Sequence, residues 1–547
     1  MTCTTQVLQA AAIALLAYIL TYIYQSYRSA LDFQAFARAN NCQPPAFPPS
    51  YLPCGLDHVY KLLTYKGDSF LDDFIFARFK TAGRWTVVTP ALGGTFTVMT
   101  ADPRNIQTVL STKFVDYGVG RRRYYQFGPL LGYGIFTADG PVWEHSRAIL
   151  RPQFSRDQVD DLQAAEKHIQ RLFQALPTTS DDGWTEQTDL EPLFLRFMLD
   201  FGTEWLFGKS VDSQLAYLDN QSTKASNDDS ETLPSSDLGR LERSFDAAFR
   251  TAQDTLAWRI RMHGLYWLIN SKKFRNACVV LHSWADHFVA EALKAKKAQD
   301  NPSLASPPAP AAAAAEAPVA ADSKPRYSVL ASMLTQTTDP LHLRSQSMSL
   351  LLAGRDSTAR LLSFLFLELA RHPSTWSQLR ASVLATFGPD PSSSPPHDPS
   401  SPPPHNPSAS YPPLTPQNLH LLPLLSHLIN ETLRLYPLIP LNARTTLGAT
   451  VLPLGGGSDG LAPLALPKDT LVTFSAYVTH RRPDIWGGDA HEWRPQRWEG
   501  RKAALGTPGG VADGFFPFNA GPRVCLGMRW AVAVAGWVVR ALRGMSG

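Results

Sequence analysis

The sequence predicts a mainly α-helical protein with small β-sheets. Its longest helical pattern begins at Asp339-Pro340 and ends at His372-Pro373, and proline is favoured in the first turn of a helix and just past its end. Two short segments, residues 85–89 and 95–100, alternate in hydropathy around a turn with proline and glycine, which is typical of a β-hairpin. With 547 residues and 44% hydrophobic content, the chain can bury a large core.

The composition argues against several classes of protein. A formal net charge of +4 is small for 547 residues and argues against nucleic acid as the main partner. The five cysteines are scattered and lack the paired spacing of zinc sites or disulfide frameworks. This cysteine pattern fits a reducing compartment.

The N-terminus carries an uncharged run, residues 7–24, that is about the minimum length for a membrane crossing. Two tyrosines and then Arg28 stand at its far end, which suits an anchor whose body stays cytoplasmic. We therefore expect a single-pass membrane anchor at residues 1–27 and a stiff, proline-rich linker at residues 28–56. A cleaved signal peptide is the alternative, but the run has no charged start.

Three later stretches have a biased composition. Residues 222–237 are polar, and we expect a loop between helices. Residues 300–324 are rich in proline, alanine and serine, and residues 388–416 are rich in proline and serine and contain histidines. We expect both stretches to be disordered insertions at the surface. His397 and His405 in the last stretch are a weak suggestion of a metal site, and a solvated tract is the simpler interpretation.

Two local motifs belong to the predicted sheets. Asp102-Pro103 follows the hairpin and should begin a helix. Residues 455–460 match the pattern G-x-G-x-x-G, but residues 461–468 read as a turn and a strand rather than the helix of a nucleotide site. The chain thus has no nicotinamide or flavin fingerprint, and we expect its electrons to come from another protein.

The long helix that ends at His372 is interrupted in its middle by Gly354, Asp356, Ser357 and Thr358. Glycine inside a helix costs up to about 1 kcal/mol relative to alanine, and buried polar groups without partners cost more. Room for a small ligand and a water would explain the interruption. A packing irregularity is the alternative.

A second unusual stretch surrounds Cys525. Phe518, Gly521 and Arg523 precede the cysteine, Gly527 follows it, and a helical run begins at once. Backbone N–H groups and the helix dipole at such a position stabilise a thiolate, and a thiolate is one of the side chains that hold haem iron. A buried structural cysteine in a glycine-rich turn is the alternative.

Two pairs of residues have the spacing of neighbours on one helix face, which by itself is common in helices. Trp143 and Arg147 are four residues apart and share one face of a helix, and Glu431 and Arg434 do so at a spacing of three within the predicted helix 422–435.

Together these motifs resemble the cytochrome P450 family, from about residue 57 onward. The stretch around Cys525 resembles the family's Phe-x-x-Gly-x-Arg-x-Cys-x-Gly loop, and the interruption resembles its oxygen-binding Ala-Gly-x-Asp-Thr-Thr helix. The pair at 143 and 147 resembles the Trp-x-x-x-Arg helix, and the pair at 431 and 434 resembles the Glu-x-x-Arg helix.

The resemblance implies a cytochrome P450 fold over residues 57–547 and a role for each matching residue. Cys525 would be the axial thiolate of heme b, and Asp356, Ser357 and Thr358 would serve oxygen activation, the first two as a proton relay. The remaining haem contacts would come from Trp143, Arg147, Arg444, Phe518, Arg523 and Gly527. A structural triad would consist of Glu431, Arg434 and Arg497.

Two departures from the family concern the same helix. Ser357 replaces the usual threonine and lacks the methyl group that restrains its rotamer, so oxygen activation should be leakier. Ala353 stands where related animal fatty-acid hydroxylases carry a glutamate that can bond the haem covalently, so we expect a noncovalent haem.

The local stretches at residues 353–358, 455–468 and 480–500 look most like fungal cytochromes P450 that hydroxylate alkanes and fatty acids. The resemblance then implies a monooxygenase of the endoplasmic reticulum membrane with a cytosolic catalytic domain. It would use O2, a lipophilic substrate and electrons from NADPH-cytochrome P450 reductase. The alternatives are a tailoring hydroxylase of a fungal secondary-metabolite pathway and a membrane-anchored haem-binding protein with little turnover.

The sequence ends at residue 547, soon after Cys525, whereas family members usually continue with a β-rich segment along the substrate pocket. We expect that segment to be absent, through a natural truncation, a nonfunctional product or a wrongly predicted final exon. Such a form should bind haem but turn over lipid slowly and with mixed regiochemistry.

Overall fold

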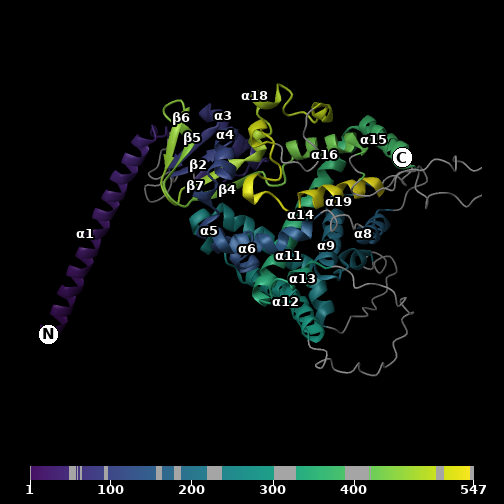
Figure 1. The fold of residues 1–547 in the computed structure, drawn as a ribbon, viewed down its shortest axis with the longest axis horizontal. Coiled ribbons are helices and arrows are strands. Elements are labelled where there is room, and N and C mark those ends of the chain that lie inside the picture. The colour runs from purple at the N-terminus through teal and green to yellow at the C-terminus, as the bar shows by residue number, and fades with distance from the viewer. Residues whose placement is uncertain are drawn as a thin grey trace, which may run out of the picture. The chain divides into compact units, whose positions relative to one another are not determined.

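The protein is described here from a computed structural model (Figure 1). The described residues are 2–47, 57, 60, 61, 64–90, 96–155, 163–177, 187–218, 237–300, 328–388, 418, 421–500 and 510–541. Apart from single residues at their edges, the expected loop at 222–237 and the expected insertions at 300–324 and 388–416 lie outside them.

The chain divides into two compact units, each made of three segments. The first unit comprises Met1–Gly118, Pro440–Gly488 and Gly509–Arg523, and the second comprises Val119–Ile439, Asp489–Pro508 and Val524–Gly547.

The first unit holds two sheets. The larger sheet has the strand order β1-β2-β7-β4-β3, and the smaller one pairs β5 with β6. The strands are β1 (Thr86–Pro90), β2 (Phe96–Thr100), β3 (Tyr117–Gly118), β4 (Leu441–Thr446), β5 (Thr450–Gly456), β6 (Ala462–Leu466) and β7 (Leu471–Ser475). The predicted hairpin is confirmed, because β1 and β2 pair antiparallel with Thr86 opposite Thr100. The G-x-G-x-x-G stretch connects β5 to β6 and no helix follows it, as expected.

The helices of the first unit are mostly short. They are α1 (Thr2–Ala39), α3 (Ala77–Ala82), α4 (Pro103–Gln107), α17 (Ala476–Thr479) and α18 (Pro483–Trp486), with π-helices at Phe70–Phe76 and Thr108–Thr112 and 3-10 helices at Phe114–Asp116, Val511–Asp513 and Gly521–Arg523. Asp102 caps α4 as predicted, since its Oδ1 accepts a hydrogen bond from the Arg104 N–H at 3.0 Å.

The first helix, α1, continues to Ala39, past residue 27 where we ended the expected anchor. Within the part of the chain that the structure describes, we find no helix whose length and apolar character would let it cross a membrane. The predicted membrane-spanning anchor is therefore not confirmed.

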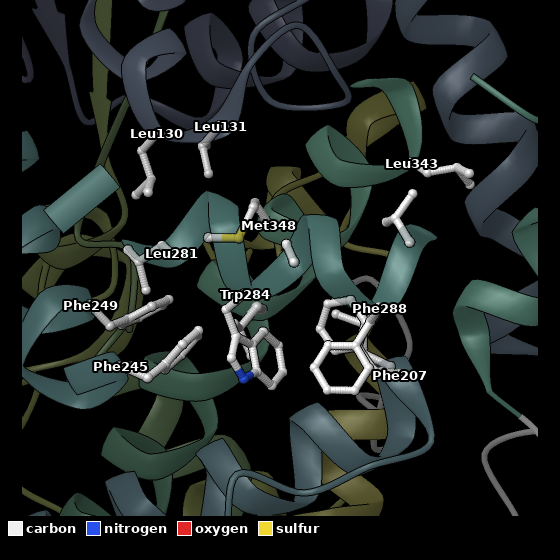
Figure 2. Close-up of a cluster of buried hydrophobic side chains, with 14 of the residues drawn as sticks. Leu130, Leu131, Phe207, Phe245, Phe249, Leu281, Trp284, Phe288, Leu343 and Met348 are labelled. Atoms are coloured by element: carbon white, nitrogen blue, oxygen red, sulfur yellow. The ribbon is translucent and has the colours of Figure 1, made fainter. Parts of the chain in front are cut away.

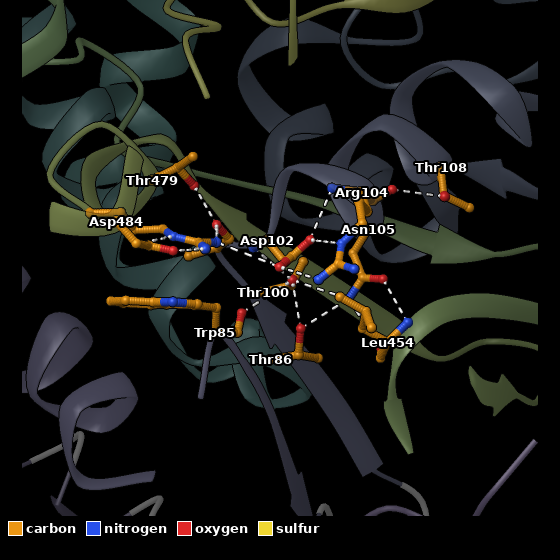
Figure 3. Close-up of polar contacts among 12 residues, drawn as sticks. Trp85, Thr86, Thr100, Asp102, Arg104, Asn105, Thr108, Leu454, Thr479 and Asp484 are labelled. Carbon is orange, nitrogen blue, oxygen red and sulfur yellow. Dashed lines mark hydrogen bonds and ion pairs between the residues drawn. The ribbon is translucent and has the colours of Figure 1, made fainter. Parts of the chain in front are cut away.

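Buried polar side chains tie α4 to the strands of the first unit (Figure 3). The Asn105 amide donates to Thr86 Oγ1 at 2.9 Å and to the Leu454 carbonyl at 3.0 Å, and its oxygen accepts from the Leu454 N–H at 3.0 Å. All of these groups are buried. The loss of any one partner would therefore leave a buried donor or acceptor without a hydrogen bond, which destabilises the fold.

The second unit is helical. It contains α5 (Gly120–Leu131), α6 (Gly140–Leu150), α8 (Gln163–Gln174), α9 (Leu190–Phe207), α11 (Asp237–Arg261), α12 (Lys272–Asp300), α13 (Val329–Met333), α14 (Pro340–Arg371), α15 (Pro373–Phe387), α16 (Pro423–Leu435) and α19 (Met528–Ala541), with 3-10 helices at Arg151–Phe154, His263–Leu268 and Pro495–Trp498. The longest predicted helix is confirmed as α14, where Asp339 caps the first turn and His372 follows the last residue.

An aromatic core joins α9, α11 and α12 (Figure 2). The ring of Trp284 lies 4.8 Å from Phe207, 4.8 Å from Phe245 and 4.6 Å from Phe288, measured between ring centroids. Met348 and other apolar residues of α14 belong to the same cluster, so α14 is held on this side by packing. The prediction of a mainly helical protein with small sheets is confirmed.

Candidate functional site

Cys525 lies just before α19 in the second unit, and its side chain is exposed. The surrounding protein nevertheless desolvates the sulfur and raises the pKa of the thiol. A hydrogen bond from the Gly527 backbone N–H and the positive charge of Arg147 act in the opposite direction. The sulfur is thus accessible while the groups that favour a thiolate are already in place.

Arg147 joins α6 to the stretch around Cys525. Its Nη1 donates to the Val524 carbonyl at 3.1 Å, and its guanidinium carbon lies 5.9 Å from the ring of Trp143, which is buried on the same helix face. The structure therefore brings Trp143, Arg147, Cys525 and Gly527 together. Burial lowers the pKa of Arg147, but a guanidinium stays charged at neutral pH and can bind a carboxylate.

The middle of α14 presents small side chains. Ala353 is exposed and Gly354 and Ser357 are half-buried, although buried residues flank them on both sides. A Cβ on Gly354 would meet the Trp530 ring of α19 at 3.7 Å, and Trp530 in turn stacks on Phe201 of α9 with ring centroids 5.5 Å apart. The helix that follows Cys525 therefore packs against α14 beside this small-residue face.

The residues of the second unit fit a haem group. A flat, anionic macrocycle with one thiolate ligand requires an accessible thiol, a cation for its carboxylates and a helix face with small side chains. Cys525 with the Gly527 N–H supplies the first, Arg147 the second, and the middle of α14 the third. Cys525 would hold the iron, and Trp143 and Arg147 would hold a propionate.

The acid and the hydroxyls of α14 have different surroundings. Asp356 Oδ2 accepts from the Gln253 amide of α11 at 2.7 Å, and its Oδ1 accepts from Arg355 at 3.3 Å. Ser357 Oγ donates to the Ala353 carbonyl at 2.6 Å. Thr358 is fully buried, and its hydroxyl has no hydrogen-bond partner among the described residues.

The sequence did not predict a role for three residues around Asp356, which are Asp246, Gln253 and Arg355. Arg355 is buried and pairs with Asp246 of α11 at 2.5 Å. The available signal was a polar stripe at residues 246, 250 and 253, which share one helix face at spacings of four and three while apolar residues occupy the face beside it.

The three residues predicted to form a triad lie together in the second unit and are buried. Arg434 donates to both carboxylate oxygens of Glu431, at 2.9 and 2.8 Å, and Arg497 Nε donates to Glu431 Oε1 at 2.9 Å. The Trp498 indole and the Arg494 backbone N–H complete five hydrogen bonds to this one carboxylate, at 2.9 and 2.8 Å. Such complete pairing is what a buried charge requires.

The remaining predicted haem contacts belong to the first unit. Arg444 of β4 is buried and donates to the Ala443 carbonyl at 2.9 Å. Phe518 and Arg523 are half-buried, and Arg523 is the last residue of the 3-10 helix Gly521–Arg523. Gly521 has a φ of +66°, and a Cβ there would lie 1.8 Å from the Leu110 carbonyl oxygen. The motif glycine at this position is therefore required by both conformation and space.

Comparisons with known proteins identify the family of the chain. The family model described as cytochrome P450 matches residues 56–535. Cytochrome P450 monooxygenase g430 of a Fusarium species is 39% identical over 532 residues, which cover 96% of this chain and 83% of that protein. Cytochrome P450 monooxygenase alt2 of Alternaria solani is 34% identical, with coverages of 92% and 85%. Cytochrome P450 52A5 of Candida maltosa is 37% identical over 451 residues, with coverages of 82% and 74%.

The fold is also similar to that of a solved structure, the cytochrome P450DA haem domain. The TM-score is 0.61, the sequence identity is 19%, and the alignment covers 92% of this chain and 90% of that one.

Proposed function

Because the chain belongs to the cytochrome P450 family and is therefore a haem-dependent monooxygenase, we propose that it hydroxylates long-chain fatty acids or alkanes with Cys525 as the ligand of the haem iron. The single observation that carries the ligand assignment is the accessible Cys525 thiol, held beside Arg147 and the Gly527 N–H. The substrate class rests on the local stretches that resemble fungal alkane and fatty-acid hydroxylases.

The haem contacts follow from the same residues. Trp143, Arg147, Arg444 and Arg523 would bind the propionates, while Phe518 and Gly527 would shape the stretch around the cysteine. Ala353 offers no carboxylate to the haem, so attachment is noncovalent. When bound, the thiolate-ligated haem would supply the activation of dioxygen, so that one oxygen atom is inserted into a substrate C–H bond and the other leaves as water.

The protein's own chemical task is to deliver protons to the site. Asp356 exchanges protons with water, and Ser357 passes them on through its hydroxyl, which returns to its bond with the Ala353 carbonyl afterwards. This role would explain why polar residues interrupt the apolar pattern of α14. We assign residues 57–547 to this catalytic domain and Glu431, Arg434 and Arg497 to its structural support.

Electrons and location complete the proposal. The family uses O2 and a redox partner, and we propose NADPH-cytochrome P450 reductase as that partner.

We also propose that α1 attaches the enzyme to the endoplasmic reticulum membrane with the catalytic domain in the cytosol. In support, Leu15, Leu16, Leu20 and Ile23 of α1 are 56–60% exposed, an apolar surface suited to lipid. Deleting residues 1–27 should move much of the protein out of microsomes, and full retention after an alkaline carbonate wash would exclude this attachment.

The test is a turnover assay with added reductase, NADPH and a library of lipids. Unmodified protein should hydroxylate long-chain fatty acids or alkanes, and its reduced form should give the thiolate-type Soret band with carbon monoxide. Cys525→Ser should lose that band, and an unchanged band would assign the iron to another residue. Turnover of polyketide or other secondary-metabolite chains alone would favour the tailoring hydroxylase. A normal band without any turnover would favour the haem-binding protein.

A further inference from the structure

The carboxylate of Asp356 is held from two directions, and neither bond goes to Ser357. Gln253 of α11 donates its amide N–H to Oδ2 at 2.7 Å, and Arg355 donates to Oδ1 at 3.3 Å. The neighbouring hydroxyl of Ser357 is bonded to the Ala353 carbonyl of its own helix. In this arrangement the acid and the hydroxyl of the proposed relay are not in direct contact, and the direction in which the acid points is set by α11.

The two partners of Asp356 differ in charge and in burial. Arg355 is almost fully buried, pairs with Asp246 of α11 at 2.5 Å, and has its guanidinium carbon 5.0 Å from the ring centroid of the buried Phe249. A cation placed between two carboxylates and an aromatic face is firmly fixed. Gln253 is half-buried and neutral and makes a single bond to the acid, at close to the ideal length. Because Gln253 is half-buried whereas Arg355 is buried and fixed by Asp246, water can replace the Gln253 amide more readily than the guanidinium.

We infer that Gln253 is a positioning residue that sets the orientation of the Asp356 carboxylate and thereby the delivery of protons to the site. This inference rests on the proposed function. To pass a proton, the Asp356 carboxylate leaves the Gln253 amide and takes a proton from solvent. It gives this proton through water to the Ser357 hydroxyl, which releases its own proton toward the site, and the carboxylate returns to the amide as an anion. Through Gln253, the position of α11 decides whether the acid can act.

The test replaces Gln253 with leucine, which keeps the helix and the approximate volume but removes the donor. The assay contains the full chain, haem, reductase, NADPH and dodecanoic acid. A positioned proton donor contributes roughly 100-fold or more, so we expect loss of orientation alone to lower kcat about tenfold and to enlarge the solvent deuterium isotope effect. The dissociation constant of dodecanoic acid, measured from the shift of the Soret band, should not change.

The decisive comparison is a double-mutant cycle with Asp356→Asn. If Gln253 acts through Asp356, then Gln253→Leu has no further effect on kcat or on the isotope effect in the Asp356→Asn background. If the double variant instead lowers kcat by the product of the two separate factors, the inference is overturned. An unchanged kcat in Gln253→Leu alone would overturn it as well. A crystal structure of Gln253→Leu should show the Asp356 side chain in a new rotamer, and an unmoved carboxylate would also count against it.

Thr255→Val serves as the matched control on the same helix. Its hydroxyl donates only to the Thr251 carbonyl one turn earlier, at 2.8 Å, so the variant should keep kcat and the isotope effect of the unmodified enzyme. If the unmodified enzyme turns over no lipid, the proposed function fails. The positioning role is then read separately from the solvent isotope effect on NADPH consumption and peroxide release without lipid, together with the Asp356 rotamer.

Discussion

Replacing Glu431 with glutamine should destabilise the protein more than any comparable change at an exposed ion pair. The carboxylate is fully buried and accepts hydrogen bonds from Arg434, Arg497, Trp498 and the backbone of Arg494. An amide of the same size cannot accept at both ends, and it leaves two buried guanidinium groups without their shared anion.

The magnitude follows from this geometry. Removing one partner of a buried ion pair costs about 3–5 kcal/mol, and the total stability of a folded domain is on the order of 5–15 kcal/mol. Glu431→Gln should therefore lower the urea midpoint strongly and reduce the fraction of protein that shows the thiolate-type Soret band after expression.

Glu191→Gln provides the control in the same unit. Glu191 lies 3.7 Å from Arg360, and both side chains are about half exposed, so its loss should cost less than about 1 kcal/mol. Equal urea midpoints for the two variants would refute the claim that full pairing of a buried carboxylate holds this part of the unit together.

Two further predictions concern the proposed site. Ser357→Ala removes the relay hydroxyl and should raise the peroxide formed per NADPH consumed, while Ser357→Thr should lower it; unchanged coupling in both variants would exclude Ser357 from the relay. Gly521→Ala places a Cβ 1.8 Å from the Leu110 carbonyl oxygen in a left-handed conformation, so the variant should fail to retain haem on gel filtration, and normal haem content would show that the backbone can shift to admit it.

Sequence alone was sufficient where the signal is local. The cap at Asp339, the hairpin formed by β1 and β2, and the shared face of Trp143 and Arg147 each depend on residues within a few positions of one another. The stretch around Cys525 could be recognised for the same reason, since Gly521, Arg523 and Cys525 lie at alternate positions of one short segment.

Partners chosen by tertiary packing could not be predicted in this way. Arg147 bonds to Val524, 377 positions away, and Gln253 bonds to Asp356, 103 positions away. No local pattern distinguishes such a glutamine from any other polar residue on a helix, because the geometry that selects it arises only when α11 packs on α14. The proposed roles of Asp356 and Ser357 rest on a sequence motif. That the two side chains have separate hydrogen-bond partners is seen only in the structure.

Thr358 tests whether every polar group in the middle of α14 serves the same purpose. Its hydroxyl is fully buried and has no partner among the described residues, which costs about 1–3 kcal/mol if nothing else pairs with it. Valine has nearly the same shape and removes the unpaired group. If Ser357 alone carries the relay, Thr358→Val should raise the thermal midpoint and leave peroxide formation unchanged. A lower midpoint together with increased peroxide would instead mean that the Thr358 hydroxyl is paired in the working enzyme and belongs to the proton path.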